Sequence, residues 1–421
     1  MTKERLLSII SDQDTTVNSR LEALKELDKP HISDKCEYVN NHIHTSFSFS
    51  PYTPTSAVYY AALAGLSTAG IMDHDSVGGC EEFIDAGKVL GMPVTVGFEC
   101  RTSVKGTPLE GLRLNNPDQK SVAYVTLHGI PHDMLGKCAE ILAPLRAKRN
   151  ERNIKMCAKI SEICGVELDF DNDVLPLSQY RNGGSVTERH VLYALAKKLV
   201  SDDREASVKR VEDLTVPMSD KTRQKLLDAP DDFFTYDVLG ILKSHLVEKI
   251  YIDADEELMH ITDFTKLAQE VGGICAYAYL GDVTESPTGD KKAQKFEDDY
   301  LDELFINLKE FGFNAVTYMP SRNTKDQLER IISLCNEHGF FQISGEDINS
   351  PRQSFTCPAM ADYPDLFDST YALIGHEIAA TADISNGMFT EKTINKMPTL
   401  DERTAFYAEI GRKEGLYDKR N

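Results

Sequence analysis

Three short stretches decide the fold of this 421-residue chain: Asn41-His42-Ile43-His44-Thr45, Ile71-Met72-Asp73-His74-Asp75 and Gly97-Phe98-Glu99. Each follows an apolar or β-branched run of the kind that forms a buried strand, and each ends in side chains that bind metals. The carboxyl ends of the strands of a parallel barrel meet at one face, where the active site is built. The three stretches therefore predict an α/β barrel with polar groups gathered at that face.

The first stretch places two imidazoles together. His42 and His44 are two residues apart, so both side chains lie on the same face of an extended strand. A lone pair of this kind also arises by chance or as buried polar groups, and by itself it is modest evidence. The repetition of metal-type residues at Asp73, His74 and Glu99 makes a metal site the better interpretation. Imidazoles and carboxylates together suit zinc, manganese or iron, so the pattern predicts a metal centre.

The charge of the chain limits its partners. Acidic residues outnumber basic ones, 67 against 46, for a formal net charge of -21. This composition argues against a nucleic-acid surface, which needs clustered lysines and arginines. A small phosphorylated substrate remains compatible, because metal ions would meet its charge locally.

Cysteine usage and hydropathy predict where the protein resides. The nine cysteines are odd in number and contain no Cys-x-x-Cys pair, so they read as reduced thiols of an intracellular protein. The N-terminal apolar run is too short for a signal peptide, and no stretch reaches the length of a membrane span. We expect a soluble, cytoplasmic protein with no membrane partner; the sequence carries no signal for its oligomeric state.

The pattern along the chain predicts four regions. Leucines at helical spacing open it, β-rich and amphipathic runs then alternate, and long charged helical patterns interrupt that alternation. The predicted organisation is a helical leader over 1–36, a barrel over 37–140 and 262–350, a helical insertion subdomain over 141–261, and an extension over 351–421 that packs on the barrel. The extension reads as irregular apart from a closing helix near 403–414.

Further motifs extend the first three. The β-type run 122–127 ends at His128, and Val186-Thr187-Glu188-Arg189-His190 and Gly345-Glu346-Asp347-Ile348-Asn349 follow later. In this order the motifs resemble the PHP (polymerase and histidinol phosphatase) family over residues 37 to 350, most of all its stand-alone bacterial phosphoesterases. The resemblance implies a distorted seven-stranded βα barrel with two or three metal ions at the C-terminal ends of its strands, usually used for phosphoester hydrolysis.

The resemblance also implies a role for each matching residue. His42, His44, Glu99 and Asp347 would bind one metal ion, and Glu99 would bridge to a second ion held with His128 and His190. His74 matches a histidine that commonly reaches a third ion, with Asp73 as its orienting group or as a further ligand.

The chain departs from the family pattern at three places, and each departure removes an imidazole or a carboxylate. Ser46 to Ser50 stand where a histidine or aspartate is common, Ala276 to Tyr279 where a His-Pro is usual, and Asn349 where a histidine ends the last motif. These losses fall mainly on the third site. We therefore expect two divalent ions (zinc, manganese or iron), with at most a weak third site.

A two-metal site predicts hydrolysis by a metal-activated hydroxide that attacks phosphorus, with His74 or Asp75 as the general acid. Arg101 shares a strand face with Glu99, so it is a candidate for binding substrate, although an ion pair is the commoner role of such an arginine. The other candidates for binding substrate are Arg189, Tyr277 and Asn349. Two alternatives stay open: an amidohydrolase-type C–N hydrolase on a related barrel, and a degenerate, non-catalytic domain that binds a phosphorylated ligand.

Overall fold

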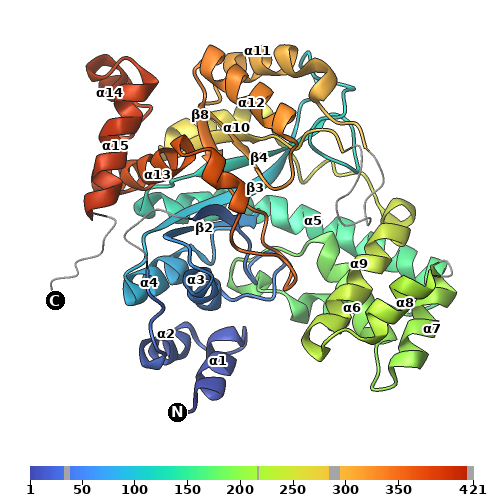
Figure 1. Ribbon diagram of the computed structural model, residues 1–421. Helices are drawn as coiled ribbons and strands as arrows, with labels where there is room; N and C mark the ends of the chain where they lie inside the picture. The colour runs from blue at the N-terminus through green and yellow to red at the C-terminus, as the bar shows by residue number, and fades with distance from the viewer. Residues whose placement is uncertain (33–37, 216–217, 284–293, 415–421) are drawn as a thin grey trace.

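A nearly closed, barrel-like sheet lies at the centre of the molecule in the computed structural model, which describes residues 1–32, 38–215, 218–283 and 294–414 (Figure 1). Seven strands follow one another around it: β1 (Val39–Ile43), β2 (Thr68–His74), β3 (Val94–Ser103), β4 (Val122–His128), β6 (Ile274–Ala278), β7 (Ala315–Tyr318) and β8 (Phe341–Ser344). The two-residue strand β5 (Met259–His260) pairs with β3. The runs that lead to the first three motifs and the run over 122–127 correspond to β1, β2, β3 and β4, and β3 continues past Glu99 to Ser103.

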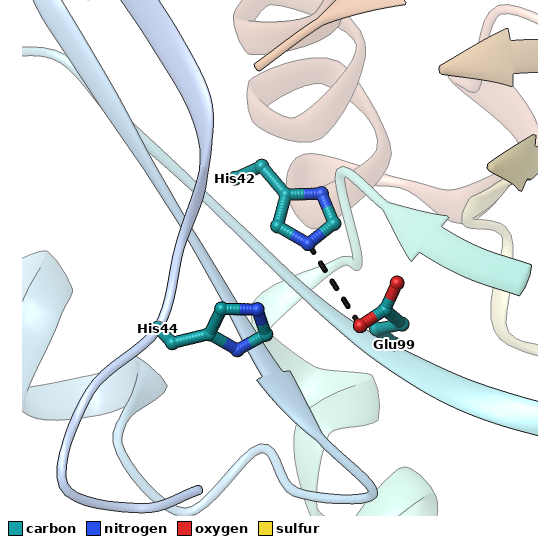
Figure 2. Close-up of side chains that lie close together, drawn as sticks. All are labelled: His42, His44 and Glu99. Atoms are coloured by element: carbon teal, nitrogen blue, oxygen red, sulfur yellow. Dashed lines mark ion pairs between the residues drawn. The ribbon is translucent and has the colours of Figure 1, made fainter. Parts of the chain in front are cut away.

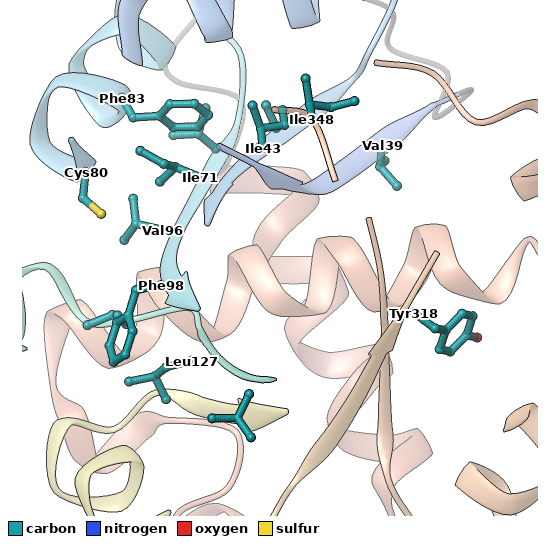
Figure 3. Packing of buried hydrophobic residues seen from close by; sticks show 14 of the residues in the cluster. Val39, Ile43, Ile71, Cys80, Phe83, Val96, Phe98, Leu127, Tyr318 and Ile348 are labelled. Carbon is teal, nitrogen blue, oxygen red and sulfur yellow. The ribbon is translucent and has the colours of Figure 1, made fainter. Parts of the chain in front are cut away.

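The seam of the barrel lies beside the first predicted metal ligands. Ile43 forms a parallel bridge with Ile348, and the two side chains lie together in Figure 3. The backbone N–H of His44 donates to the carbonyl of Ile348 at 3.0 Å, and the N–H of Ile348 donates to the carbonyl of His42 at 3.2 Å. These bonds bring the segment after β8 against the end of β1, so the first and last predicted motifs become neighbours.

One strand does not run in the predicted direction. β4 is antiparallel to both β3 and β6, with His128 opposite Gly97 and Thr126 opposite Glu99. The connection over 104–121 contains no crossover helix, which a parallel return would need, so β4 starts at the rim where β3 ends. Gly97 permits this pairing, because a Cβ there would lie 2.3 Å from the carbonyl oxygen of Leu127. The expectation of a fully parallel barrel is therefore wrong at β4.

Helices cover the outside of the sheet. Those that follow the strands are α3 (Pro54–Leu63), α4 (Cys80–Leu90), α10 (Ile261–Val271), α11 (Leu301–Phe311) and α12 (Lys325–His338). Ile71 and Val96 of the sheet pack with Cys80 and Phe83 of α4 in one buried cluster (Figure 3). A sheet buried on both faces needs continuous apolar strands, which explains why the strand signal in the sequence is strong.

The N-terminal leader forms a helical hairpin, α1 (Lys3–Ser11) and α2 (Val17–Glu26), on the outside of α3 and α4 (Figure 1). The buried guanidinium of Arg20 donates to the carboxylate of Glu82 on α4 at 2.6 Å. Glu82 also accepts hydrogen bonds from the backbone and side chain of Thr55. The hairpin is therefore attached through a buried ion pair as well as through its leucines.

Five helices form the green body beside the barrel in Figure 1: α5 (Leu135–Cys164), α6 (Glu188–Leu199), α7 (Arg204–Leu214), α8 (Asp220–Leu227) and α9 (Asp231–Ile250). They share a hydrophobic cluster separate from that of the barrel, with Ile160, Val191 and Leu242 among its buried members. This part of the chain thus has a core of its own, and α5 runs from it into the barrel core through Leu135, Cys138 and Leu142.

The expectation of irregular structure after Pro351 is wrong. The segment contains α13 (Asp365–Ala382), which packs on β8, followed by α14 (Glu391–Lys396) and α15 (Leu400–Glu414). Gly375 and Gly411 let α13 and α15 cross closely, since a Cβ at either would lie about 2 Å from a carbonyl oxygen of the other helix. The closing helix near 403–414 corresponds to α15. None of the helices in the described ranges has the length and apolar character needed to span a membrane.

Candidate metal centre

His42, His44 and Glu99 meet at the rim of the barrel (Figure 2). One ligand atom from each lies within 4.8 Å of the others, and all three residues are buried. The imidazoles come from the end of β1 and the loop that follows it, while the carboxylate comes from the middle of β3. The pairing of β1 with β2 shifts register between Asn40 and Ile43, an irregularity that redirects side chains next to a site.

Two further predicted residues complete the cluster. His74 Nδ1 lies 2.9 Å from Glu99 Oε2, and His44 Nε2 lies 3.2 Å from Asp347 Oδ1. The rings of His44 and His74 stack with their centroids 4.6 Å apart. The side chain of His44 is 1% exposed and that of Asp347 is 37% exposed, so the cluster opens to solvent on the Asp347 side.

The electrostatics keep this cluster ready to receive a cation. Burial alone would raise the pKa of Glu99, but the charge of His74 and the ion pair with His42 at 3.8 Å lower that pKa below its usual value, and against its own burial His42 has a raised pKa because of Glu99. Burial lowers the pKa of His44 despite its contact with Asp347. The ionised carboxylate of Glu99 and the neutral imidazole of His44 are donors of the kind that a divalent cation requires, and a bound cation would displace the proton that Glu99 favours on His42.

His128 provides an independent observation. Its ring is fully buried, and neither ring nitrogen has a hydrogen-bond partner among the residues that the structure describes. Burial lowers the pKa of the ring to about 3, with a further contribution from His42. A buried imidazole without partners is costly, and coordination to a cation would satisfy one of its nitrogens. The residues at this rim therefore fit a bound metal ion.

His190 has a hydrogen bond that opposes a role as a ligand. Its Nδ1 accepts from the backbone N–H of Thr187 at 3.0 Å and thereby caps the start of α6. When Nδ1 is the acceptor in a neutral ring, Nε2 carries the proton and is a donor. Burial, together with the charge of Arg149, lowers the pKa of this ring to about 3. The geometry favours His190 as a hydrogen-bond donor over the second-metal ligand that the resemblance implies.

The two aspartates beside His74 are engaged elsewhere. The carboxylate of Asp73 accepts three hydrogen bonds of 2.6 Å, from the backbone and hydroxyl of Thr45 and from Ser48. These bonds hold the loop after His44, which favours the orienting role of Asp73 over the ligand role. The carboxylate of Asp75 pairs with Arg149 at 2.5 Å. Of the two candidate general acids, His74 is the one in contact with the cluster.

Arg101 lies in a buried ion-pair network. It pairs with Glu188 at 3.0 Å and also with Glu257, and its side chain is 4% exposed. Arg149 and Arg152 of α5 pair with the same carboxylates. The structure thus favours the ion-pair alternative for Arg101.

Of the other candidates for binding substrate, Arg189 and Asn349 connect to the cluster, whereas Tyr277 follows Ala276, which shares a sheet face with Glu99, and therefore points to the opposite face. Arg189 donates to the side-chain oxygen of Asn349 at 2.7 Å, and Asn349 donates in turn to Asp347. These two residues form a chain of hydrogen bonds that ends at the partner of His44. The hydroxyl of Tyr277 is buried and has no hydrogen-bond partner within the described part of the chain, and burial raises the pKa of this phenol.

The arginines of α5 were not identified from the sequence. Arg146, Arg149 and Arg152 are three residues apart and buried, and Arg146 donates to the backbone carbonyl of Asp75 at 3.0 Å. A spacing of three residues on a long helix was a usable signal, because it places the three side chains along one side. The many other charged residues of this helix obscure that signal, because charged side chains on a helix are usually solvated.

Comparison with known proteins relates this fold to two solved structures. No family model and no curated protein matches the chain. A structure of a proposed metal-dependent phosphoesterase from Bifidobacterium adolescentis aligns with a TM-score of 0.51 at 19% identity, over 78% of this chain and 95% of that one. An amidohydrolase from Chromobacterium violaceum, solved with bound sulfate and no metal, aligns with a TM-score of 0.51 at 18% identity, over 76% and 90%. The fold is shared with both. At these identities the likeness concerns the fold alone, so function has to be argued from the site.

Proposed function

We propose that this protein is a metal-dependent hydrolase that cleaves a small phosphate ester. The observation that carries the proposal is the buried cluster of His42, His44 and Glu99, joined to His74 and Asp347 at the rim of the barrel. Buried charges and imidazoles persist in proteins when they are paired or bind a metal. Here imidazoles and carboxylates gather, and among the described residues the ion pairs of Glu99 are with histidines and not with a lysine or arginine.

The residues suggest how two divalent ions, zinc, manganese or iron, would be held. His42, His44 and Asp347 would hold one ion, Glu99 would be shared, and His128, whose ring nitrogens have no partner among the described residues, would contribute to the other, while His74 contacts Glu99. Divalent ions in such a site lower the pKa of water from about 16 toward about 7 and neutralise charge on phosphoryl oxygens. The three losses of ligand type, at Ser46 to Ser50, Tyr277 and Asn349, support two ions rather than three.

The protein side chains supply orientation and a proton. His74 Nδ1 lies 2.9 Å from Glu99 Oε2, so Nε2 is the ring nitrogen outside this contact. The side chain of His74 is 22% exposed, more than that of Glu99 or His42. From this position Nε2–H can donate to the leaving oxygen of an ester, the work of a general acid. Asp73 holds the loop that carries His44, and Asn349 orients Asp347.

Amide hydrolysis is the second candidate, because the similar Chromobacterium violaceum structure is of an amidohydrolase. A ligand-binding domain without catalysis is the third, because Tyr277 and Asn349 stand where relatives have imidazoles. The fold does not separate these candidates, since the same rim of a barrel serves different chemistries.

One experiment compares all three. The protein is loaded in turn with zinc, manganese and iron, its metal content is measured, and phosphomonoesters and amides are assayed in parallel. We expect phosphomonoester hydrolysis that depends on metal and is abolished, together with metal binding, in the double variant His42→Ala and His44→Ala. His31→Ala, which changes an exposed histidine far from the cluster, is the matched control. Hydrolysis of amides alone, or full activity in the double variant, would overturn the proposal.

A further inference from the structure

A cavity of about 300 Å³ opens beside the candidate metal centre. It is lined by the loop after β1, by α6 and α9 of the helical region, and by the turn between α1 and α2. Ser46, which is two residues after His44, lies in its wall, and so does His190. The space therefore lies next to the loop that follows His44 and next to His190, which is near enough to His74 for its pKa to be affected, and it reaches away between three separate parts of the chain.

Aromatic rings form one side of this cavity. Phe49 packs edge-on against His190 with centroids 5.0 Å apart, and against Tyr193 with centroids 5.6 Å apart. Tyr193 and Tyr236 lie 5.0 Å apart with an interplanar angle of 37°. Phe49 is buried, whereas Tyr193 and Tyr236 remain partly exposed, so the two tyrosines present ring surface to the space.

Three residues of α6 line the cavity because they lie on the same face of the helix. His190, Tyr193 and Lys197 lie at positions i, i+3 and i+7, which share one face of a helix, and all three line the space. Tyr236 reaches it from α9, so the ring surface depends on the contact between these two helices. If α6 and α9 did not pack together, the rings of Tyr193 and Tyr236 would be open to solvent.

The charges at the mouth of the cavity restrict what it can accept. Lys197 is exposed and makes no ion pair with the residues that the structure describes, while Asp12 and Asp14 line the opposite side. Two carboxylates against one ammonium disfavour a second anionic group on the ligand. Serine hydroxyls and carboxylates can instead accept hydrogen bonds from neutral donors.

We propose that this cavity is the subsite for the leaving group of the substrate, and that it selects an uncharged, planar aromatic ring. The inference rests on the proposed function, because the phosphate of the same molecule is taken to lie at the metal centre. The ring packs against Tyr193 and Tyr236, where offset or edge-to-face contacts between aromatic groups add to simple burial of area. The position beside His44 and His190 connects the ring to an ester at the cluster.

The test compares two esters with the same number of carbons, one with an aromatic ring and one with a saturated ring. Benzyl phosphate and cyclohexylmethyl phosphate each carry seven carbons and release a primary alcohol, so their chemical steps are closely matched. With metal-loaded, full-length protein we expect kcat/KM to favour the benzyl ester by about fivefold to tenfold, the range of one or two aromatic contacts. We also expect 4-carboxybenzyl phosphate to be a poorer substrate than 4-hydroxymethylbenzyl phosphate.

Variants connect this preference to the cavity. Tyr193→Ala and Tyr236→Ala should each reduce the benzyl preference toward unity, and Tyr193→Phe should keep it because the ring remains. Tyr60→Ala, which changes a partly exposed tyrosine of α3 outside the cavity, should keep it as well. The inference is overturned if the two esters are hydrolysed equally well, if the preference survives both tyrosine-to-alanine changes, or if the carboxylated ester is the better substrate.

A binding measurement separates this inference from the proposed function. Benzylphosphonate and cyclohexylmethylphosphonate cannot be hydrolysed as esters, and calorimetry gives their affinities without any turnover. If no phosphate ester is hydrolysed but benzylphosphonate still binds several-fold more tightly, and Tyr193→Ala removes that difference, then the ring subsite stands and the proposed reaction fails. If hydrolysis proceeds and neither phosphonate is preferred, then the reaction stands and the subsite fails.

Discussion

Two of the buried charged clusters in the described part of the chain differ in composition in an instructive way. At the rim, Glu99 is surrounded by imidazoles, and His128 has no partner among the described residues. In the second cluster, between the barrel and α5, each carboxylate meets guanidinium groups: Glu188 pairs with Arg101, Arg149 and Arg152. The second cluster contains its own cations, the guanidinium groups. The first cluster is rich in acceptors, and among the described residues it contains no such cation.

This difference distinguishes a site from a structural connection. Arginine is always charged and forms paired hydrogen bonds with carboxylates, so a network of arginine and glutamate is complete within the protein. Neutral imidazoles beside a carboxylate remain open to a divalent ion. Burial of charge by itself therefore identifies neither a metal site nor an active site. The balance of donors and acceptors around the buried charge distinguishes such a site from a structural ion pair.

The largest expected effect comes from removing the charge at the centre of the first cluster. Glu99→Gln should weaken metal binding by more than about 100-fold, beyond the range typical of outer-shell groups, and should abolish hydrolysis. Metal content after dialysis and phosphatase activity measure the two effects. Glu81→Gln, an exposed change on α4, is the control. Unchanged metal content in Glu99→Gln would mean that the rim cluster holds no ion.

Breaking the second cluster should affect folding rather than metal binding. Glu188→Gln leaves the buried charges of Arg101, Arg149 and Arg152 short of a counter-charge, so the free energy of unfolding should fall by about 3–5 kcal/mol. Urea unfolding measures this. The matched variant Glu205→Gln removes an exposed partner of Arg223 and should cost less than about 1 kcal/mol. Equal effects of the two changes would show that the network contributes no more than a surface pair.

A third buried carboxylate, that of Glu297, forms no ion pair with an arginine or a histidine within the ranges that the structure describes. Oε1 of Glu297 accepts from the backbone of Leu280 and Gly281, its Oε2 has no partner in the described ranges, and burial raises its pKa from 4.5 to about 7. The folded state therefore holds this proton more tightly than the unfolded state does. Stability should fall by about 3 kcal/mol as the pH rises from 4.5 to 7, and then level off.

The variant Glu297→Gln removes the titrating group and keeps the acceptor for both backbone N–H groups. The difference in unfolding free energy between variant and parent should therefore grow in favour of the variant from pH 5 to pH 8. Denaturant titrations at several pH values test this. A constant difference across that range would show that Glu297 titrates normally.

The smallest expected effect concerns the orientation of the loop after His44. Asp73→Asn replaces one of the oxygens that accept from Thr45 and Ser48 with a donor, so it should weaken metal affinity by about tenfold without removing a ligand. Asp85→Asn on the exposed face of α4 is the control. Metal titration followed by calorimetry measures the change, and a loss as large as that in Glu99→Gln would instead assign Asp73 as a ligand.

Much of the site was predictable because its residues follow strands. His42, His44, His74 and Glu99 each stand at or near the end of an apolar run, and strand ends of a barrel converge. Asp347 was reached through the family resemblance, and the structure places it against His44. The roles of Arg101 and His190 were less accessible, because their partners Glu257 and the backbone of Thr187 are chosen by the packing of the helical region.

The sequence by itself determined the order of the strands, most helices and the chemical types at the rim, since these depend on local periodicity and on side-chain identity. Only the tertiary structure decided the direction of β4, the packing of α13 on β8, and the division of buried charges into two clusters. The physical reason is how far apart the interacting residues lie along the chain. Strand direction and ion pairing join residues far apart in the chain, such as Arg101 and Glu257, and a local pattern carries no record of the partner.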